Sequence, residues 1–259
     1  MRRLLIGDRK VRVRDEGEAG KKAPVVLIHG AGASSVVWID VIRRLAGQRR
    51  VIAPDLPGHG QSDDWHAAHG EALLDLYRDA VGTICARLGV ERAVLVGHSM
   101  GGAVALRCAL ASPARVTGLV LVGSGARMRV SSQVLATLAN PDNEPREVIA
   151  AAAYAPSTAP EIVDRWRAVI VQAEREVLLR DLAACDGVDL RPRLAELNLP
   201  ALAIGGSDDL MMPPKLSREF AEKSPNARVV IVPHTGHMIF HENLTAFHDA
   251  LDPFLAEVA

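Results

Sequence analysis

Short, mostly apolar runs recur along the chain, and helical patterns alternate with them. Such runs are typical of strands that are buried on both faces of a sheet. Helical patterns occupy residues 71–88, stopped by Gly89, and about 101–111, stopped by Ser112-Pro113. This alternation predicts an α/β protein in which right-handed crossovers join parallel strands and helices cover both faces of the sheet. The runs lie at 24–28, 51–55, 93–96, 116–122, 201–204 and 229–232.

Residues 127–190 interrupt this alternation. They are rich in alanine and show helical patterns around 131–140, 145–154 and 160–184, but no strand pattern. We call this segment the helical insert. Because it falls between two strands whose ends carry reactive residues, we expect it to form a cap over the sheet edge, although a plain pair of packing helices is the alternative. Residues 1–126 and 191–259 would then form the core.

The two ends of the chain carry further local signals. Gly7-Asp8 separates two short strand patterns and predicts a hairpin. Near the other end, Asn243 is placed to cap a helix that starts at Leu244. Pro253 falls inside that helical pattern, so we expect a kink or a break there.

Composition excludes several classes of function. The 259 residues carry 30 Lys and Arg against 31 Asp and Glu, so there is no basic field for nucleic acid. Three scattered cysteines make neither a disulfide framework nor a zinc site. No run approaches the length of a membrane helix, and no secretory segment is evident at the start. We therefore expect a cytoplasmic protein with no nucleic-acid or membrane partner.

The strongest chemical motif is Gly97-His98-Ser99-Met100-Gly101, which fits G-x-S-x-G. It lies directly after one predicted strand and before a predicted helix. In that position the serine oxygen is exposed on a strained turn, and the free N–H groups of the helix start face it. A surface turn that happens to contain serine is the alternative. We predict that Ser99 is a nucleophile.

A serine hydroxyl needs a base in contact with it, and the base needs an orienting acceptor. His237 follows the last strand on a glycine-containing loop, where catalytic groups gather in open α/β sheets. His234 lies on the same loop and is its main rival, whereas His241 and His248 are expected on the surface. His98 adjoins the serine, but neighbouring side chains at such a turn are expected to point apart.

The orienting carboxylate should follow the strand at 201–204. Asp208 and Asp209 both stand there, and spacing alone does not choose between them.

Two glycine-containing loops follow strands near the predicted site. In His29-Gly30-Ala31-Gly32, the glycines allow a close approach of backbone to a ligand, although a generic tight turn would look the same. The N–H of Ala31, together with that of Met100, would form an oxyanion hole. The loop at 55–62 is interpreted as a structural turn, and neither loop matches a phosphate-binding motif.

Metal binding is not indicated. His66 and His69 lie near Asp63 and Asp64, but this region is polar and is typical of a solvated loop. We expect no metal and no organic cofactor.

Taken together, these motifs resemble the α/β-hydrolase superfamily, in particular small esterase-like members with a helical cap. The resemblance covers almost the whole chain and includes the family's order of Ser, Asp and His. It implies a mostly parallel eight-stranded sheet with an inserted helical cap. The family's acid loop reads Gly-x-x-Asp with proline four residues later, which Gly206, Asp209 and Pro213 match. The resemblance therefore selects Asp209, and it supports Ser99, His237, Ala31 and Met100 in the roles given above.

Some relatives are disfavoured by particular residues. Haloalkane dehalogenases and epoxide hydrolases use aspartate where this chain has Ser99. The carbon–carbon bond hydrolases of aromatic degradation usually have a longer Ser-Gly-rich run than Ala31-Gly32-Ala33, and proline iminopeptidases usually carry Gly-Gly-Ser-Trp-Gly.

The expected activity is hydrolysis of a small or medium carboxylic ester through an acyl-enzyme. Lactonase or thioesterase activity would use the same residues, and a cofactor-free perhydrolase side reaction or a non-enzymatic small-molecule receptor are further alternatives. Since aromatic residues make up only 3% of the chain, the pocket should be walled by aliphatic carbon. The residues expected at the pocket are Gly30, Met128, Tyr154, Met212 and Met238.

Overall fold

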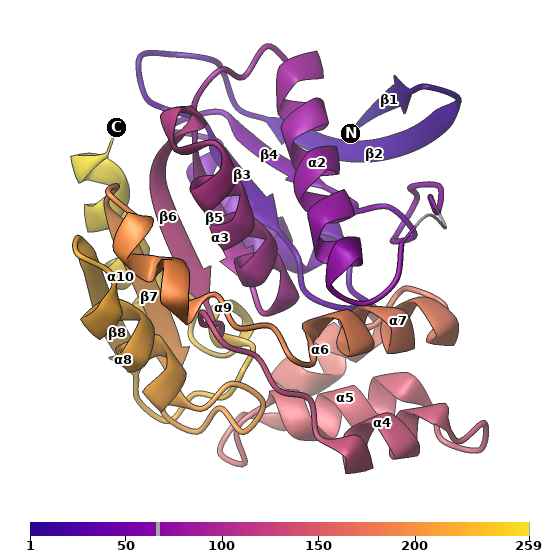
Figure 1. Cartoon of the computed structure of the whole chain (residues 1–259). Helices are drawn as coiled ribbons and strands as arrows, with labels where there is room; N and C mark the ends of the chain where they lie inside the picture. Colours follow the sequence, from indigo (N-terminus) through magenta and orange to yellow (C-terminus); the bar gives the residue numbers. More distant parts are fainter. Residues whose placement is uncertain (66–67, 259) are drawn as a thin grey trace.

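The computed structural model describes residues 1–65 and 68–258 and contains one eight-stranded mixed sheet (Figure 1). The strand order is β1-β2-β4-β3-β5-β6-β7-β8. The pairs β1–β2 and β2–β4 are antiparallel, and the other neighbours are parallel. The α/β class and the eight-stranded, mostly parallel sheet are therefore confirmed. The strands are β1 (Arg2–Ile6), β2 (Arg9–Glu16), β3 (Val25–Ile28), β4 (Val51–Pro54), β5 (Ala93–His98), β6 (Val116–Val122), β7 (Ala201–Gly206) and β8 (Ala227–Val232).

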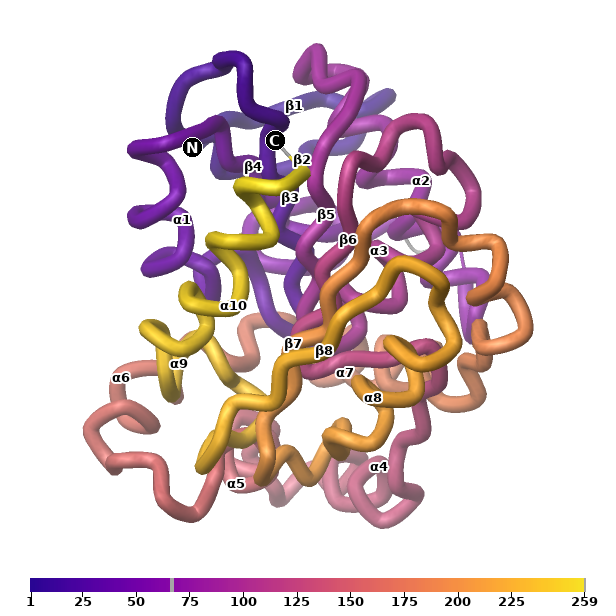
Figure 2. Tube along the Cα trace, turned by 90° about the vertical axis from the view of Figure 1, so that its left-hand side faces the viewer, coloured from indigo at the N-terminus to yellow at the C-terminus, as the bar shows by residue number. Residues whose placement is uncertain are grey.

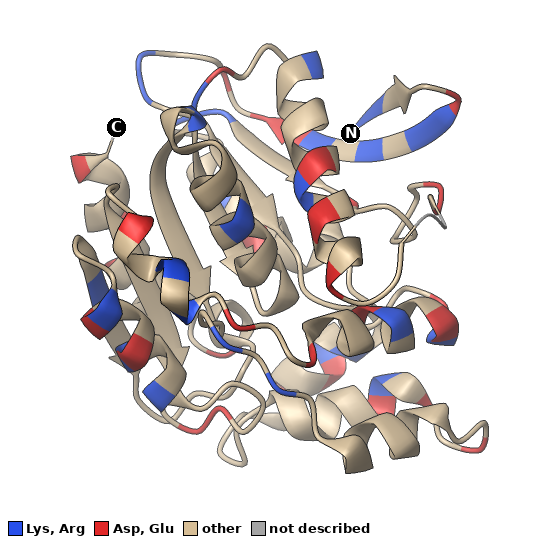
Figure 3. Ribbon diagram, in the orientation of Figure 1, with Lys and Arg blue, Asp and Glu red and all other residues tan. Residues whose placement is uncertain are grey.

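The predicted N-terminal hairpin is formed by β1 and β2. Gly7 at its tip has φ +64, and Ile6 pairs with Arg9 across the turn. Much of this ribbon carries Lys and Arg, whereas the central strands carry almost no charge (Figure 3). Charged side chains on an edge strand discourage further strand pairing, so the hairpin closes this side of the sheet.

Helices cover both faces of the sheet, as the alternating pattern predicted. In Figure 2 the sheet is seen between α1 and α10 on one side and α2 and α3 on the other. The helices outside the insert are α1 (Ile39–Leu45), α2 (Glu71–Arg87), α3 (Met100–Ala111), α8 (Pro214–Lys223), α9 (Ile239–Glu242) and α10 (Leu244–Glu257). Short 3-10 turns lie at Ser35–Trp38, Pro113–Arg115 and Arg191–Glu196.

The core is divided by the sheet into two apolar clusters. Along β3, Val26 and Ile28 pack into the cluster beneath α2 and α3, while Val25 and Leu27 pack into the cluster beneath α1 and α10. All four side chains are at most 1% exposed. Successive strand residues point to opposite faces, so a strand with both faces covered must be apolar throughout.

The helical insert forms four helices, which gather at one end of the sheet (Figure 1). They are α4 (Ser132–Ala139), α5 (Pro145–Ala153), α6 (Pro160–Ile170) and α7 (Arg175–Cys185). The helical pattern at 160–184 is thus two helices, separated at residues 171–174. The two ends of the insert lie side by side, because Arg127 and Asp189 form an isolated antiparallel bridge.

Of the kink or break predicted at Pro253, the break is wrong. Asn243 caps α10 as expected, accepting a hydrogen bond from the N–H of Ala246 at 3.0 Å, but the helix continues through Pro253 to Glu257. Proline removes the hydrogen bond to the carbonyl of Asp249. Both residues are exposed, so water can satisfy that carbonyl and the helix need not end.

Two histidines near this helix also differ from expectation. His241 and His248 were expected on the surface but are only 7% and 0% exposed. At least one ring nitrogen of each has a hydrogen-bond partner. One nitrogen of His241 bonds the carbonyl of Val37, and His248 bonds Asp252. Among the described residues, no helix is both long and apolar enough to cross a bilayer.

Candidate active site

Ser99 lies at the sharp turn between β5 and α3. Its backbone has φ 52 and ψ −121, a conformation that L-residues rarely adopt. The two motif glycines make the turn possible: a Cβ on Gly97 would lie 2.1 Å from the carbonyl oxygen of Gly101, and one on Gly101 would lie 2.3 Å from that of Ile28. The N–H of Ser99 donates to the carbonyl of Val122, which ties the turn to β6.

Asp209 and His237 meet at the ends of β7 and β8. His237 Nδ1 lies 2.8 Å from Asp209 Oδ2, and both residues are 3% exposed. The other carboxylate oxygen of Asp209 accepts the N–H groups of Met211 at 2.9 Å and Met212 at 2.8 Å. These bonds fix the carboxylate, so it can hold the imidazole in the tautomer that carries its proton on Nδ1.

The alternative acid and base lie elsewhere. Asp208 is turned toward Ser207 Oγ, 2.8 Å away. His234 is exposed, and its backbone N–H donates to Ser207 Oγ. The structure thus pairs the two residues that the family resemblance selected, a choice that spacing could not make.

His98, whose side chain was expected to point away from that of Ser99, packs directly against His237. The two ring centroids are 4.6 Å apart, and His98 Nε2 donates to the backbone carbonyl of His237 at 3.1 Å. Burial, and then the proximity of His237, hold the pKa of His98 well below its ordinary value. His98 is therefore a neutral support for the His237 loop.

A small cavity of about 40 Å³ lies over Ser99 and His237. Its walls are aliphatic and come from both the core and the helical insert. Gly30 and Met238 line it as expected. The remaining lining residues are Ala31, Ala33, Val37, His98, Ile149, Ala153, Ile170, Leu178, Leu182 and Met211.

Three residues expected at the pocket have other positions. Met128 and Met212 pack into the core cluster beneath α2 and α3. Tyr154 places its hydroxyl 3.1 Å from His241 Nδ1. Met211, one residue from Met212, faces the cavity in its place, and a sequence pattern in an irregular loop does not reveal which of two neighbours points inward.

Of the two predicted oxyanion donors, one lines this cavity and the other directly follows Ser99 in the chain. Ala31 lines it, and Met100 is the first residue of α3, where backbone N–H groups lack partners within the helix. The side chain of Met100 packs into the core cluster beneath α2 and α3, and the whole residue is 0% exposed. Their joint role in binding an oxyanion stays a prediction.

Glu242, which no sequence motif indicated, holds the loop of His237 in place. Its carboxylate accepts the N–H groups of Gly236 at 3.0 Å and of Met238 at 3.2 Å, on either side of the histidine. It also accepts the N–H of Ala155 at 2.9 Å and the hydroxyl of Thr158 in the insert. One carboxylate therefore joins the histidine loop to the insert.

Replacing Glu242 with glutamine should lower kcat by about 10-fold and reduce the free energy of unfolding by about 1–3 kcal/mol. The glutamine amide has one oxygen acceptor and one NH₂ donor. Some of the groups that donate to the Glu242 carboxylate would therefore face a donor and lose their hydrogen bond. Steady-state kinetics and urea unfolding measure the two effects. Glu222→Gln on α8, an exposed position, is the matched control and should change neither quantity. Equal behaviour of the two variants would contradict the role of Glu242.

The structure adds no support for a metal centre. Within residues 1–65 and 68–258, no three His, Cys, Asp or Glu side chains are grouped to hold a metal ion. His66 lies outside the described residues, so the pair of His66 and His69 cannot be placed.

Comparison with known proteins gives the family. The model of the alpha/beta hydrolase family matches residues 25–250. A dihydrolipoyllysine-residue acetyltransferase component of an acetoin cleaving system from Pseudomonas putida is 34% identical, over 96% of this chain and 68% of its own length. A 2-hydroxy-6-oxononadienedioate/2-hydroxy-6-oxononatrienedioate hydrolase from Paraburkholderia phymatum is 30% identical, over 98% and 94%.

Solved structures agree with the fold. A thermophilic esterase from Thermogutta terrifontis superposes with a TM-score of 0.86 at 25% identity, over 100% of this chain and 99% of the esterase. The strained serine turn, the acid and histidine loops at the ends of β7 and β8, and the match over residues 25–250 lead to one conclusion: this chain belongs to the alpha/beta hydrolase family.

Proposed function

We propose that the protein hydrolyses a carboxylic ester with a small aliphatic acyl group through an acyl-enzyme, using Ser99, His237 and Asp209. The observation that carries this proposal is the 2.8 Å contact between His237 and Asp209, together with a cavity that Ser99 and His237 both line. The family match and the esterase neighbour support the reaction class.

The reaction follows from the position of each group. His237 takes the proton of Ser99 as the serine oxygen attacks the ester carbonyl, and Asp209 stabilises the resulting imidazolium. The N–H groups of Ala31 and Met100 bind the oxyanion of the tetrahedral intermediate. His237 then protonates the leaving alcohol. Water attacks the acyl-enzyme by the same sequence of proton transfers and releases the acid.

The cavity favours a small, uncharged acyl group. Its volume of about 40 Å³ is far below the roughly 300–1,000 Å³ of ordinary ligand pockets. Among the described residues that line it there is no Lys or Arg to pair with a carboxylate. This disfavours a dioate, the kind of compound named for the Paraburkholderia relative. A longer acyl chain would require the helical insert, acting as a cap, to move away from the core.

Fluorophosphonate labelling with mapping of the labelled residue tests the proposal, followed by a panel of p-nitrophenyl esters, lactones and thioesters. We expect the label on Ser99 and the highest kcat/KM on a short-chain ester. A preference of at least 10-fold for lactones or thioesters would mean that the same residues catalyse lactone or thioester hydrolysis instead. Absence of both label and turnover would contradict the proposal.

Chain-length preference should change when the cavity is enlarged. Met211→Ala is expected to raise the ratio of kcat/KM for p-nitrophenyl octanoate to that for the acetate by about 10-fold, because the lost side chain leaves space beside Ser99. Leu210→Ala is the matched control, since Leu210 is the neighbouring residue and is 75% exposed. If both variants keep the wild-type ratio, this cavity does not hold the acyl group.

A further inference from the structure

The helical insert holds both backbone groups of Gly32, the residue after the predicted oxyanion donor Ala31. The N–H of Gly32 donates to Asp181 Oδ2 at 3.0 Å. Its carbonyl accepts the N–H groups of Gln172 at 2.7 Å and Ala173 at 2.9 Å. The peptide planes around Gly32 therefore have their orientation set by residues of the insert.

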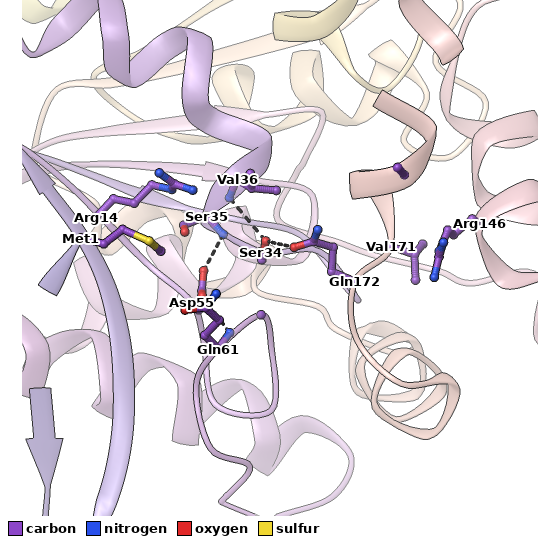
Figure 4. Close-up of a pocket in the computed structure, with 12 residues that line it drawn as sticks. Met1, Arg14, Ser34, Ser35, Val36, Asp55, Gln61, Arg146, Val171 and Gln172 are labelled. Carbon is purple, nitrogen blue, oxygen red and sulfur yellow. Dashed lines mark hydrogen bonds between the residues drawn. The ribbon is translucent and has the colours of Figure 1, made fainter. Parts of the chain in front are cut away.

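Side-chain packing and the hydrogen bonds of Ser34 and Ser35 add to the contacts between the Gly32 loop and its surroundings. A Cβ on Gly32 would lie 2.7 Å from the side chain of Leu178 on α7, so the helix is in close contact with the loop. Ser34 Oγ donates to Gln172 Oε1 at 2.7 Å, and the N–H of Ser35 donates to Asp55 Oδ1 at 2.8 Å, as Figure 4 shows. The segment from Gly32 to Ser35 thus lies between the insert and the core.

The carboxylate of Asp181 connects the insert to several parts of the core. Asp181 lies on α7, is 0% exposed and accepts three donors from separate parts of the core. Besides the N–H of Gly32, these are the Tyr77 hydroxyl from α2, at 2.7 Å from Oδ1, and His59 Nε2, at 2.7 Å from Oδ2. A buried carboxylate needs such partners, because an unpaired buried charge is very costly.

The hydrogen bonds of His59 give its protonation state. Nε2 faces Asp181, and Nδ1 faces the carbonyl of Pro57 at 3.0 Å, so both nitrogens face acceptors. Both must carry a proton, which makes His59 an imidazolium. The adjacent His29 is different: Nδ1 lies 2.8 Å from the carbonyl of Gly30, while Nε2 accepts the N–H of Leu56, so its ring is neutral.

The surroundings of His59 support this assignment. Burial opposes its charge, but the carboxylate of Asp181 outweighs burial and raises the pKa of His59 above its ordinary value. The other titratable groups that face it are Tyr77 from α2, Arg180 from α7 and His29 after β3. Burial, and then the charge of His59, lower the pKa of His29 to about 4, so His29 does not compete for the proton.

We propose that Asp181, paired with protonated His59, is a positioning residue for the oxyanion hole. By fixing the peptide that follows Ala31, it directs the Ala31 N–H into the catalytic cavity only while the helical insert is docked on the core. The proposal rests on the proposed ester hydrolysis, because it assigns Ala31 to the oxyanion. Docking of the helical insert on the core would then complete the oxyanion hole at the same time.

A dependence on pH follows. The ion pair of Asp181 and His59 is intact below pH 6.5, the ordinary pKa of histidine. It is lost as the pH rises through the raised pKa of His59 in the folded protein. Deprotonated Nε2 would then present a lone pair to the carboxylate, and the Gly32 peptide would lose its fixed position. We therefore expect an alkaline decline in reactivity. His59→Gln, whose amide donates to Asp181 at every pH, should lack this decline.

The experiment measures the rate of fluorophosphonate labelling of Ser99 between pH 6 and 10, because the phosphonyl oxygen occupies the oxyanion site. Asp181→Asn should label about 10²-fold more slowly than the wild type at pH 7, and its kcat for p-nitrophenyl acetate should fall by a similar factor with KM within about 3-fold. Asp186→Asn, an exposed position at the end of the same helix, is the control and should match the wild type.

Each outcome has a separate meaning. Wild-type labelling by Asp181→Asn, or an alkaline decline retained in His59→Gln, would overturn this proposal while leaving ester hydrolysis intact. A wild-type protein that is not labelled at Ser99 would overturn the proposed function and this proposal with it. If Asp181→Asn does not fold, the pH profile of His59→Gln still decides the matter.

Discussion

Ser99→Ala should lower kcat for ester hydrolysis by about 10⁴–10⁶-fold, because the variant has no oxygen to form the acyl-enzyme. The fold should remain intact, since the turn is set by the backbone: the N–H of Ser99 bonds Val122, its carbonyl accepts Ser124 Oγ, and its side chain caps no helix. Initial rates on p-nitrophenyl acetate, with circular dichroism to check folding, measure the two properties.

Ser112→Ala is the matched control for this prediction. Ser112 is an exposed residue at the other end of α3, so its loss should leave kcat unchanged. A Ser99→Ala protein with more than about a tenth of the wild-type kcat would show that the reaction does not pass through this residue.

Asp209→Asn should lower kcat by about 10⁴-fold, the second largest effect expected. An amide can donate to His237 Nδ1 and so favours the tautomer that lacks a proton there, which places a proton on the nitrogen that must accept one from Ser99. It also removes the charge that stabilises the imidazolium. KM should change little, because Asp209 does not line the cavity.

Asp208→Asn is the control, because Asp208 is the adjacent carboxylate and contacts Ser207 rather than His237. Its kcat should stay within about 3-fold of the wild type. If the two effects are reversed, Asp208 is the orienting acid, and the loop rearranges in solution.

The fold and the turn at Ser99 could be predicted from the sequence for reasons that are local. Apolar runs of strand length, alternating with helices, require a sheet covered on both faces, and the strained turn at Ser99 needs the glycines of its motif. Asp209 was distinguished from Asp208 only by the family resemblance, because both stand on one irregular loop. Which of them faces His237 depends on how the ends of β7 and β8 pack together.

The residues that the sequence did not reveal act through long-range contacts. Asp181 and His59 are 122 positions apart, and Glu242 and Ala155 are 87 apart. No periodicity or motif links such pairs, since each depends on how the insert lies on the core. Pro253 failed as a helix breaker for a related reason: solvent, rather than the local sequence, decides whether the freed carbonyl is costly.

The bridge between Arg127 and Asp189 has a consequence for protein engineering and for divergence within the fold. Because the segment leaves and rejoins the scaffold at adjacent points, a graft of different length could replace it without disturbing strand pairing. Such a replacement would supply new specificity. If Asp181 positions the predicted oxyanion donor as proposed, the new segment must also carry an acceptor for the N–H of Gly32. A change of specificity through the helical insert is therefore limited by the need to keep the Gly32 peptide in position.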